Sequence, residues 1–177
     1  IVDTKSAKDL IVGKGKIDFK NITFRYRKTR AVFKNFGLTI KPGEKVAFVG
    51  PSGSGKTTIV QLLLRMHDVQ KGVVEIDEQN ISKVTQNSLR KHIALVPQDP
   101  ILFHRTLMEN IRYGRLDATN KEVREAAKKA HCEEFVSKLP EKYNTYVGER
   151  GIKLSGGERQ RIAIARAILS DAPILVL

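Results

Sequence analysis

Hydrophobic and polar positions alternate at the start of the chain, and the pattern changes further along. Apolar residues occupy every second position over residues 17–26, with one phase slip at Lys20–Asn21. This alternation predicts a half-exposed strand that contains a bulge. A second strand is predicted over 33–40, closed by a turn at 41–44. The apolar run 46–49 lacks alternation and predicts a strand buried on both faces of a parallel sheet.

Helical spacing of apolar residues begins after this run. It predicts helices over 57–66, 87–91 and 155–169. Thr106 with Glu109, and Thr119 with Glu122, have the spacing of capping boxes, and the second helix is expected to extend to about Ser137. Further strands are predicted over 72–76, 93–96 and 174–177. Alternating strands and helices indicate an α/β domain.

Composition narrows the class of protein. The 177 residues are 41% hydrophobic, which is enough for a buried core. The 32 basic and 19 acidic residues give a net charge of +13, which favours polyanionic partners such as nucleic acid, anionic membrane or phosphates. The single Cys132 excludes an internal disulfide. The sequence has no apolar run long enough to span a membrane and no visible signal peptide, so we expect a soluble cytosolic piece. Residues 1–16 are expected to form a linker and not part of the core.

The strongest chemical motif follows the predicted buried strand. It fits the pattern G-x-x-x-x-G-K-[ST] with Gly50, Pro51, Ser52, Gly53, Ser54, Gly55, Lys56 and Thr57. Glycines let successive backbone N–H groups converge on phosphate oxygens, and the next helix presents its positive end. Lys56 supplies a charge for the β- and γ-phosphates, and the Thr57 hydroxyl is a hard ligand for Mg²⁺. The motif predicts a site for ATP and Mg²⁺.

A second glycine-rich helix start occurs at residues 154–160, Leu-Ser-Gly-Gly-Glu-Arg-Gln. Ser155 with Glu158 has the spacing of an ordinary capping box. Two glycines in a first turn lower helix stability, however, and bare N–H groups there suit a phosphate. A second phosphate site implies either another nucleotide or the far side of a nucleotide held by a second molecule.

The two glycine motifs, with Gln98 between them, resemble the nucleotide-binding domain of ATP-binding cassette (ABC) transporters over about residues 17–177. The resemblance implies a P-loop NTPase core with an N-terminal antiparallel β subdomain and a helical signature subdomain at about 100–165. It also implies a head-to-tail dimer with a second nucleotide-binding domain, in which each phosphate loop and the partner's signature enclose one ATP.

The resemblance assigns roles to individual residues. Tyr26 matches the aromatic residue that stacks on adenine. If stacking is its whole contribution, replacement by phenylalanine should leave the affinity for ATP nearly unchanged. Thr58 extends the phosphate loop, and Gln98 matches the glutamine that senses Mg²⁺ and the attacking water. Lys56 and Gln98 are the catalytic candidates, and Thr57 and Gln98 the metal candidates. The residues expected to contact the γ-phosphate of the partner's nucleotide are Ser155, Gly156 and Gly157, with Glu158 beside them.

Two further segments resemble exporters. Residues 145–151 resemble the cross-linking loop of exporters, and the region Gln98–Phe103 resembles the stretch that docks the transmembrane domain. Leu102 and Phe103 would then form a partly exposed apolar patch instead of core. The basic residues 1–16 fit a linker from a preceding transmembrane domain, which places the domain at the cytoplasmic face of a membrane.

One difference from the family changes what we expect for ATP hydrolysis by these 177 residues. The family's Mg²⁺-holding aspartate, general-base glutamate and switch histidine would all follow Leu177, so the domain is expected to be C-terminally incomplete. The 177 residues alone are therefore expected to bind ATP weakly without turnover.

Two alternatives remain open. A DNA-maintenance or translation ATPase could carry the same motifs, although only 99 positions separate Lys56 from Ser155, without heptads or a zinc insertion. We therefore expect no nucleic-acid partner, because the linker accounts for much of the positive charge. A nucleotide-binding or dimerisation module without turnover is the other alternative.

Overall fold

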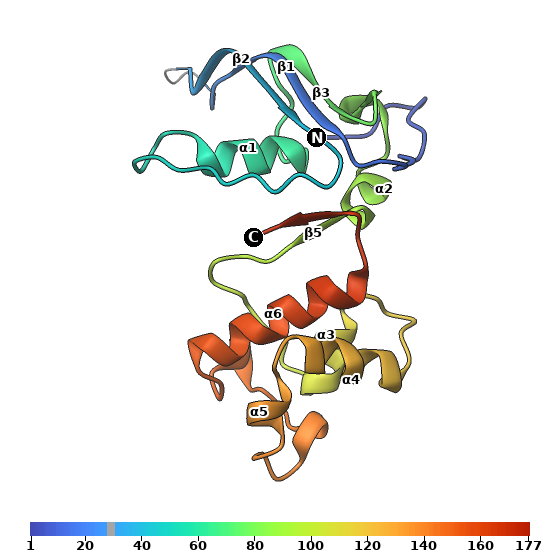
Figure 1. The fold of residues 1–177 in the computed structure, drawn as a ribbon, viewed down its shortest axis with the longest axis vertical. Helices are drawn as coiled ribbons and strands as arrows, with labels where there is room; N and C mark the ends of the chain where they lie inside the picture. The colour runs from blue at the N-terminus through green and yellow to red at the C-terminus, as the bar shows by residue number, and fades with distance from the viewer. Residues whose placement is uncertain (28–30) are drawn as a thin grey trace. The chain divides into compact units, whose positions relative to one another are not determined.

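The structure, a computed structural model, describes residues 1–27 and 31–177 and divides into two compact units (Figure 1). Unit 1 spans Ile1–Ile93, and unit 2 spans Ala94–Leu177. An antiparallel sheet dominates unit 1, and unit 2 consists mainly of helices. The chain therefore combines sheet and helix, as the sequence predicts.

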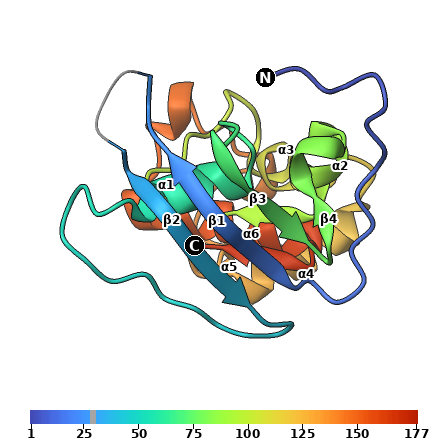
Figure 2. The same cartoon turned by 90° about the horizontal axis from the view of Figure 1, so that it is seen from above.

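Unit 1 is built on a four-stranded antiparallel sheet, seen from above in Figure 2. The strand order is β2 (Phe33–Ile40), β1 (Ile17–Phe24), β3 (Lys71–Ile76) and β4 (Gln79–Asn80). The register of β1 shifts against both neighbours, and Asn21 has a φ of 52°. The predicted bulge at Lys20–Asn21 is confirmed, because an extra residue there breaks the ladder.

Helix α1 (Lys56–Leu63) lies below this sheet in Figure 1. Its apolar residues Ile59, Leu62 and Leu63 are buried, and the inward-facing residues of β1 are buried as well. Each fully buried side chain of this size stabilises the fold by about 1.5–3 kcal/mol. The short helices η1 (Ile81–Lys83) and α2 (Gln86–Lys91) follow β4. Alternation in β1 and helical spacing in α1 thus supply one shared core.

The predicted strand over residues 46–49 is wrong. This segment has no secondary structure, and Val49 is 95% exposed. A continuous apolar run is buried only where neighbouring strands supply hydrogen bonds and other layers cover both faces. The sheet β2-β1-β3-β4 does not include this segment, so neither condition is met within the described part of unit 1.

The N-terminal segment, residues 1–16, packs against the rest of unit 1, which corrects the expectation that it lies outside the core. Leu10 is 3% exposed, and its N–H donates to Ser88 Oγ at 2.9 Å. Four consecutive N–H groups, of residues 13–16, donate to the Asp77 carboxylate at 2.8–3.0 Å. Burial would raise the pKa of Asp77, but these four bonds lower it to about 2. The carboxylate therefore fastens this segment to the end of β3.

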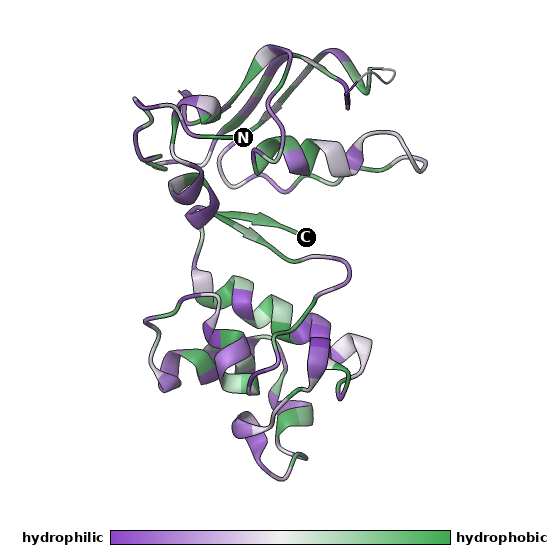
Figure 3. Ribbon diagram, turned by 180° about the vertical axis from the view of Figure 1, so that it is seen from behind, coloured by the Kyte–Doolittle hydropathy of each residue, from purple (hydrophilic) through white to green (hydrophobic). Residues whose placement is uncertain are grey.

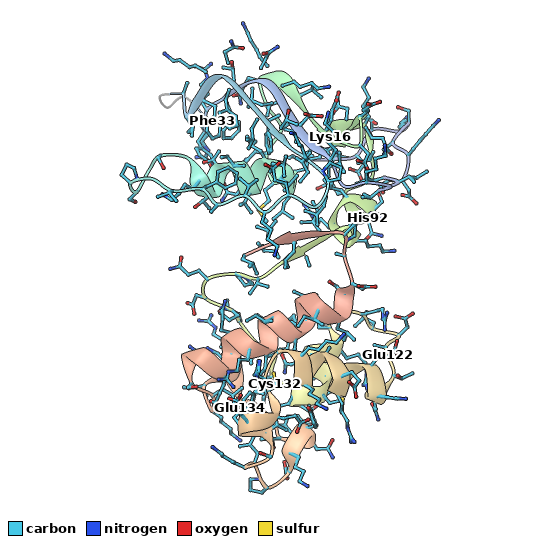
Figure 4. All side chains as sticks on the ribbon, viewed as in Figure 1. Lys16, Phe33, His92, Glu122, Cys132 and Glu134 are labelled. Atoms are coloured by element: carbon cyan, nitrogen blue, oxygen red, sulfur yellow. The ribbon has the colours of Figure 1, made fainter. Side chains whose placement is uncertain are left out.

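Unit 2 packs its helices around a single hydrophobic cluster. The helices are α3 (Leu107–Arg112), α4 (Asn120–Lys129), α5 (Glu133–Val136), η2 (Lys142–Asn144), η3 (Glu149–Gly151) and α6 (Gly156–Ser170). Cys132 lies inside this cluster (Figure 4), and burial raises the pKa of its thiol to about 12. The thiol is therefore a packing group.

Local capping signals in unit 2 are confirmed. Thr106 with Glu109, and Thr119 with Glu122, each form both reciprocal bonds of a capping box. The single helix predicted to reach Ser137 is instead divided into α4 and α5. His131, with a φ of 57°, lies between them and ends the first helix.

Two short strands complete the fold, β5 (Ile93–Leu95) and β6 (Ile174–Val176), which pair with each other. Both consist of hydrophobic residues in Figure 3. Ile93 and Ala94 are buried, whereas Leu95 is 39% exposed. The prediction of strands at these positions is confirmed, but complete burial of the first strand is not.

Candidate functional site

The predicted phosphate loop lies in unit 1 and leads into helix α1. Lys56 Nζ donates to the carbonyl oxygens of Gly50 at 2.7 Å and Pro51 at 2.8 Å, and to Ser54 Oγ at 3.4 Å. The ammonium thus lies over the loop that precedes it. An ammonium has three donors and no acceptor, so phosphate oxygens can replace these carbonyl oxygens.

The loop conformation requires glycine. Gly53 and Gly55 have φ values of 82° and 95°, which are left-handed and strained for any other residue. A Cβ at Gly50 would lie 2.9 Å from Ser54 Oγ, and one at Gly55 would lie 2.9 Å from the Phe33 ring. The glycines are therefore needed to form the loop, and they leave its backbone accessible to an anion.

The start of α1 also fits a phosphate. Its N-cap residue Gly55 forms no side-chain capping bond, and the first turn contains no acidic residue. The positive end of the helix dipole is therefore not offset by a carboxylate of its own first turn. The exposed Thr57 can offer its hydroxyl to Mg²⁺, whereas Thr58 is buried. These residues fit ATP and Mg²⁺.

Tyr26, the predicted adenine-stacking residue, lies beside this helix. Its ring is perpendicular to the rings of Phe24, at 4.9 Å, and His67, at 5.2 Å between centroids. Its hydroxyl donates to Gln61 Oε1 at 2.6 Å and lies 2.9 Å from Thr58 Oγ1. A pocket of about 380 Å³ adjoins it, lined by Phe24, Arg25, Tyr26, Arg27, His67, Asp68 and Gln70. The structure thus brings Tyr26 and the phosphate loop together in unit 1.

The second glycine motif begins α6 in unit 2. Ser155 Oγ accepts from the Glu158 N–H at 3.3 Å, and Glu158 Oε2 accepts from the Ser155 N–H at 2.7 Å. The predicted capping box is confirmed. Gly156 and Gly157 have ordinary helical backbones, because neither has a positive φ. A Cβ at Gly157 would meet nothing within 4 Å, and one at Gly156 only Arg159 Nη2 at 3.9 Å.

Gln98 lies in unit 2, in the loop after β5, and its side chain is exposed. The preceding residue, Pro97, accepts a bond at 3.3 Å from Gln160 Nε2 of α6. The structure therefore links the Gln98 loop to the helix that begins with the signature. In unit 1 the structure brings Tyr26 to the helix that follows the phosphate loop, and in unit 2 it brings the Gln98 loop to Gln160 of α6.

The predicted apolar docking patch needs one correction. Leu102 is 2% exposed and belongs to the core, whereas Ile101 and Phe103 are 66% and 46% exposed. Side chains alternate in direction along this segment, so that Leu102 points inward and its two neighbours point outward. Phe103 contacts the ring of Tyr113 at 4.6 Å, and Tyr113 is also exposed. The exposed patch therefore consists of Ile101, Phe103 and Tyr113.

The segment predicted as a cross-linking loop is anchored at one end. Tyr146 bridges Thr106 in an antiparallel pair, and the Val147 N–H donates to Arg105 O at 3.2 Å. Gly148 and Arg150 have positive φ values of 77° and 52°. The loop thus leads from its pairing with Thr106, the N-cap residue of α3, towards the start of α6.

Comparison with known families decides the class. A family model described as "ABC transporter" matches residues 33–177. The chain belongs to the ABC transporter family. That range includes the phosphate loop, the Gln98 loop and the signature helix, so the P-loop NTPase fold and the ATP-binding class that the sequence predicts are confirmed.

The chain is similar to two curated ABC proteins and to one solved ABC exporter structure. It is 51% identical to "Iron-sulfur clusters transporter ATM1, mitochondrial" of Debaryomyces hansenii over 98% of this chain and 26% of that protein. It is 49% identical to human "ATP-binding cassette sub-family B member 6" over 100% of this chain and 21% of that protein. A solved structure titled "Structure of a bacterial Atm1-family ABC exporter with ATP bound" matches 99% of this chain and 31% of that one, with a TM-score of 0.95 and 46% identity.

The chain thus spans about a quarter of the length of these relatives. None of the helices in residues 1–27 and 31–177 has the length and apolar character needed to cross a bilayer.

Sequence patterns alone did not identify several residues that shape the site. Gln61 and His67, which contact Tyr26, belong to the amphipathic pattern of α1 and the loop after it. Arg166 of α6 donates to Asn110 O at 2.6 Å and lies 5.5 Å from the centre of the Phe103 ring. These contacts join segments far apart in the sequence, and no local motif signals them.

Proposed function

We propose that this chain is the ATP-binding and hydrolysing domain of an exporter, in which ATP drives head-to-tail dimerisation of two such domains. The observation that carries the proposal is the pair of glycine-rich helix starts in separate units. The phosphate loop needs its glycines for its own conformation, whereas Gly156 and Gly157 have no such need. Glycines that lower helix stability without an internal reason indicate a close contact with another molecule.

ATP phosphates suit this external contact. At α1, Lys56 and the N–H groups of the loop would hold the β- and γ-phosphates. At α6, the first-turn N–H groups lie beside glycines that leave room for the γ-phosphate held by a second chain. One nucleotide between two chains thus explains both motifs without requiring a second nucleotide.

Residues of this chain would divide the chemistry between them. Thr57 and Gln98 would ligate Mg²⁺, which supplies neutralisation of charge on the phosphates. Gln98 would also orient the attacking water, and Tyr26 would stack on the base. Lys56 would exchange the carbonyl oxygens of Gly50 and Pro51 for phosphate oxygens as the nucleotide binds.

The partner proposed for the exposed patch is the transmembrane domain of the same transporter, reached through the Gln98–Phe103 region. Ile101 and Phe103 offer apolar contact area at this surface. Residues 1–16 are proposed to link that transmembrane domain to unit 1, which places the domain at the cytoplasmic face of a membrane. No nucleic acid is needed as a partner.

For residues 1–177 on their own, we propose weak ATP binding without turnover. The exposed segment 46–49, which leads into the phosphate loop, has no strand neighbour among the described residues of unit 1. Binding must then also order segment 46–49, which lowers the affinity of the adjoining loop for ATP. The family's base and metal carboxylates are not among these residues.

Lys56→Ala in the full-length protein tests the function. We expect MgATP binding to fall by about two orders of magnitude or more, because the main side-chain counter-charge to the phosphates is removed. Calorimetry with MgATP measures this, and Lys34→Ala, which changes an exposed lysine of β2, is the matched control. Equal ATP affinity in Lys56→Ala and Lys34→Ala would contradict the proposed role.

A further inference from the structure

The hydroxyl of Tyr26 is held by two residues on one face of α1. Its hydrogen goes to Gln61 Oε1 at 2.6 Å, so Thr58 must donate its own hydrogen to the tyrosine oxygen, at 2.9 Å. Thr58 and Gln61 are three residues apart and therefore neighbours on the helix surface. The hydroxyl is thus bonded to two residues of this helix.

The ring itself is held from other directions. Phe24, at the end of β1, packs at an interplanar angle of 82°, and His67, in the loop after α1, packs at 88°. Perpendicular aromatic contacts of this kind are favourable and directional. Polar contacts at the hydroxyl end and aromatic contacts on the ring together define one orientation of the Tyr26 side chain.

The anchors of the hydroxyl belong to the same rigid element as the phosphate loop. Helix α1 begins at Lys56, so Thr58 lies two residues and Gln61 five residues after the phosphate-binding lysine. Tyr26 comes from a different segment, just after β1. The two hydrogen bonds therefore connect the ring to the helix that presents the phosphate loop.

We propose that Gln61 and Thr58 are positioning residues for base recognition. They hold the Tyr26 ring at a set distance and angle from the phosphate loop, so that adenine and the phosphates bind one preorganised unit. The inference rests on the proposed function, since it requires that Tyr26 stacks on the base. It replaces the expectation from stacking alone that phenylalanine is equivalent to Tyr26.

The test compares two probes, ATP and inorganic tripolyphosphate, in EDTA with the full-length protein. ATP would contact both the phosphate loop and the Tyr26 ring, whereas tripolyphosphate would contact only the phosphate loop. Gln61→Leu removes the acceptor at similar volume, and we expect it to weaken ATP binding about three- to tenfold. Its affinity for tripolyphosphate should stay within about twofold of the parent protein, because the loop is unchanged.

Two variants sharpen the result. Gln61→Glu keeps an acceptor oxygen and should preserve the ratio of the two affinities. Tyr26→Phe should lower that ratio as Gln61→Leu does. Gln86→Leu is the matched control, because that glutamine bonds to Asp3 and Ile1 in the N-terminal segment.

The outcomes separate this inference from the proposed function. An unchanged ratio in Gln61→Leu, an equal loss for both probes, or an equal change of ratio in Gln86→Leu would overturn the positioning role. Retention of tripolyphosphate binding by Lys56→Ala would instead contradict the phosphate site itself.

Discussion

The starts of α1 and α6 are both glycine-rich, yet they satisfy their backbone donors differently. At α6, Ser155 and Glu158 form a reciprocal capping box, which satisfies the N–H groups of these two residues within the chain. At α1, Gly55 forms no side-chain cap, and no acidic residue lies in the first turn. Helix α1 therefore leaves its first backbone donors to an anion from outside, whereas α6 is capped by its own chain and offers space beside the cap.

A third glycine-containing segment confirms this logic within unit 1. The N–H groups of residues 13–16 converge in the way that an anion site requires, and Asp77 of the same chain supplies the anion. Here the site is closed and structural. An internal carboxylate therefore fills the anion site of residues 13–16, whereas the start of α1, with no acidic residue in its first turn, remains available to phosphate.

The largest expected effect concerns the space beside the α6 cap. Gly156→Asp in the full-length protein should abolish ATP-driven dimerisation and hydrolysis, because a carboxylate there would repel the γ-phosphate of the partner's nucleotide. ATP binding to the monomer should be unchanged, as measured by calorimetry beside a phosphate-release assay. Loss of monomer binding would mean that the signature acts on the nucleotide of its own chain.

A smaller effect is expected at the closed site. Asp77→Asn should destabilise unit 1 by about 2 kcal/mol at neutral pH, because the pKa of Asp77 is lowered to about 2 from an ordinary value near 3.8. A lowered carboxyl pKa contributes stability that is complete above about pH 4 and lost as the pH falls through 2. The difference between parent and variant in urea unfolding should therefore shrink over this range.

The exposed Asp117, in unit 2, gives the control Asp117→Asn. Its substitution should leave the unfolding midpoint nearly unchanged. Hydrogen exchange at the amides of residues 13–16 should become faster in Asp77→Asn alone. Unchanged protection of those four amides would contradict the clamp.

The smallest effect tests whether the α6 glycines have a structural role. Gly157→Ala should stabilise unit 2 by about 0.5–1 kcal/mol, since the backbone is helical and the added Cβ meets no atom within 4 Å. Gly53→Ala is the contrasting variant, because the φ of 82° at that position strains any Cβ. Thermal unfolding measures both, and destabilisation by Gly157→Ala would show that this glycine serves the fold.

The sequence predicted features whose causes are local. The capping boxes at Thr106, Thr119 and Ser155 depend on residues three positions apart, and the bulge at Asn21 breaks an alternation visible along the chain. The loop 50–57 was recognisable because its conformation itself demands glycine at defined positions.

Features that depend on distant neighbours could not be predicted in the same way. The run 46–49 is apolar enough for a buried strand, but burial is decided by strands elsewhere in the chain. Leu102 and Phe103 have similar hydrophobicity, and only the path of the backbone places one inside and the other outside. The contacts of Tyr26 with Gln61 likewise join residues 35 positions apart.

The most direct test mixes two inactive full-length proteins, Lys56→Ala and Gly156→Asp, and assays ATP hydrolysis by the mixed dimers. If a phosphate loop and the partner's signature share one nucleotide, each mixed dimer has one site with both defects and one site with neither. We therefore expect ATP-driven closure and hydrolysis to reappear on mixing, although each protein alone has none. Activity that stays at the level of the separate proteins, in dimers shown to be mixed, would contradict the shared site.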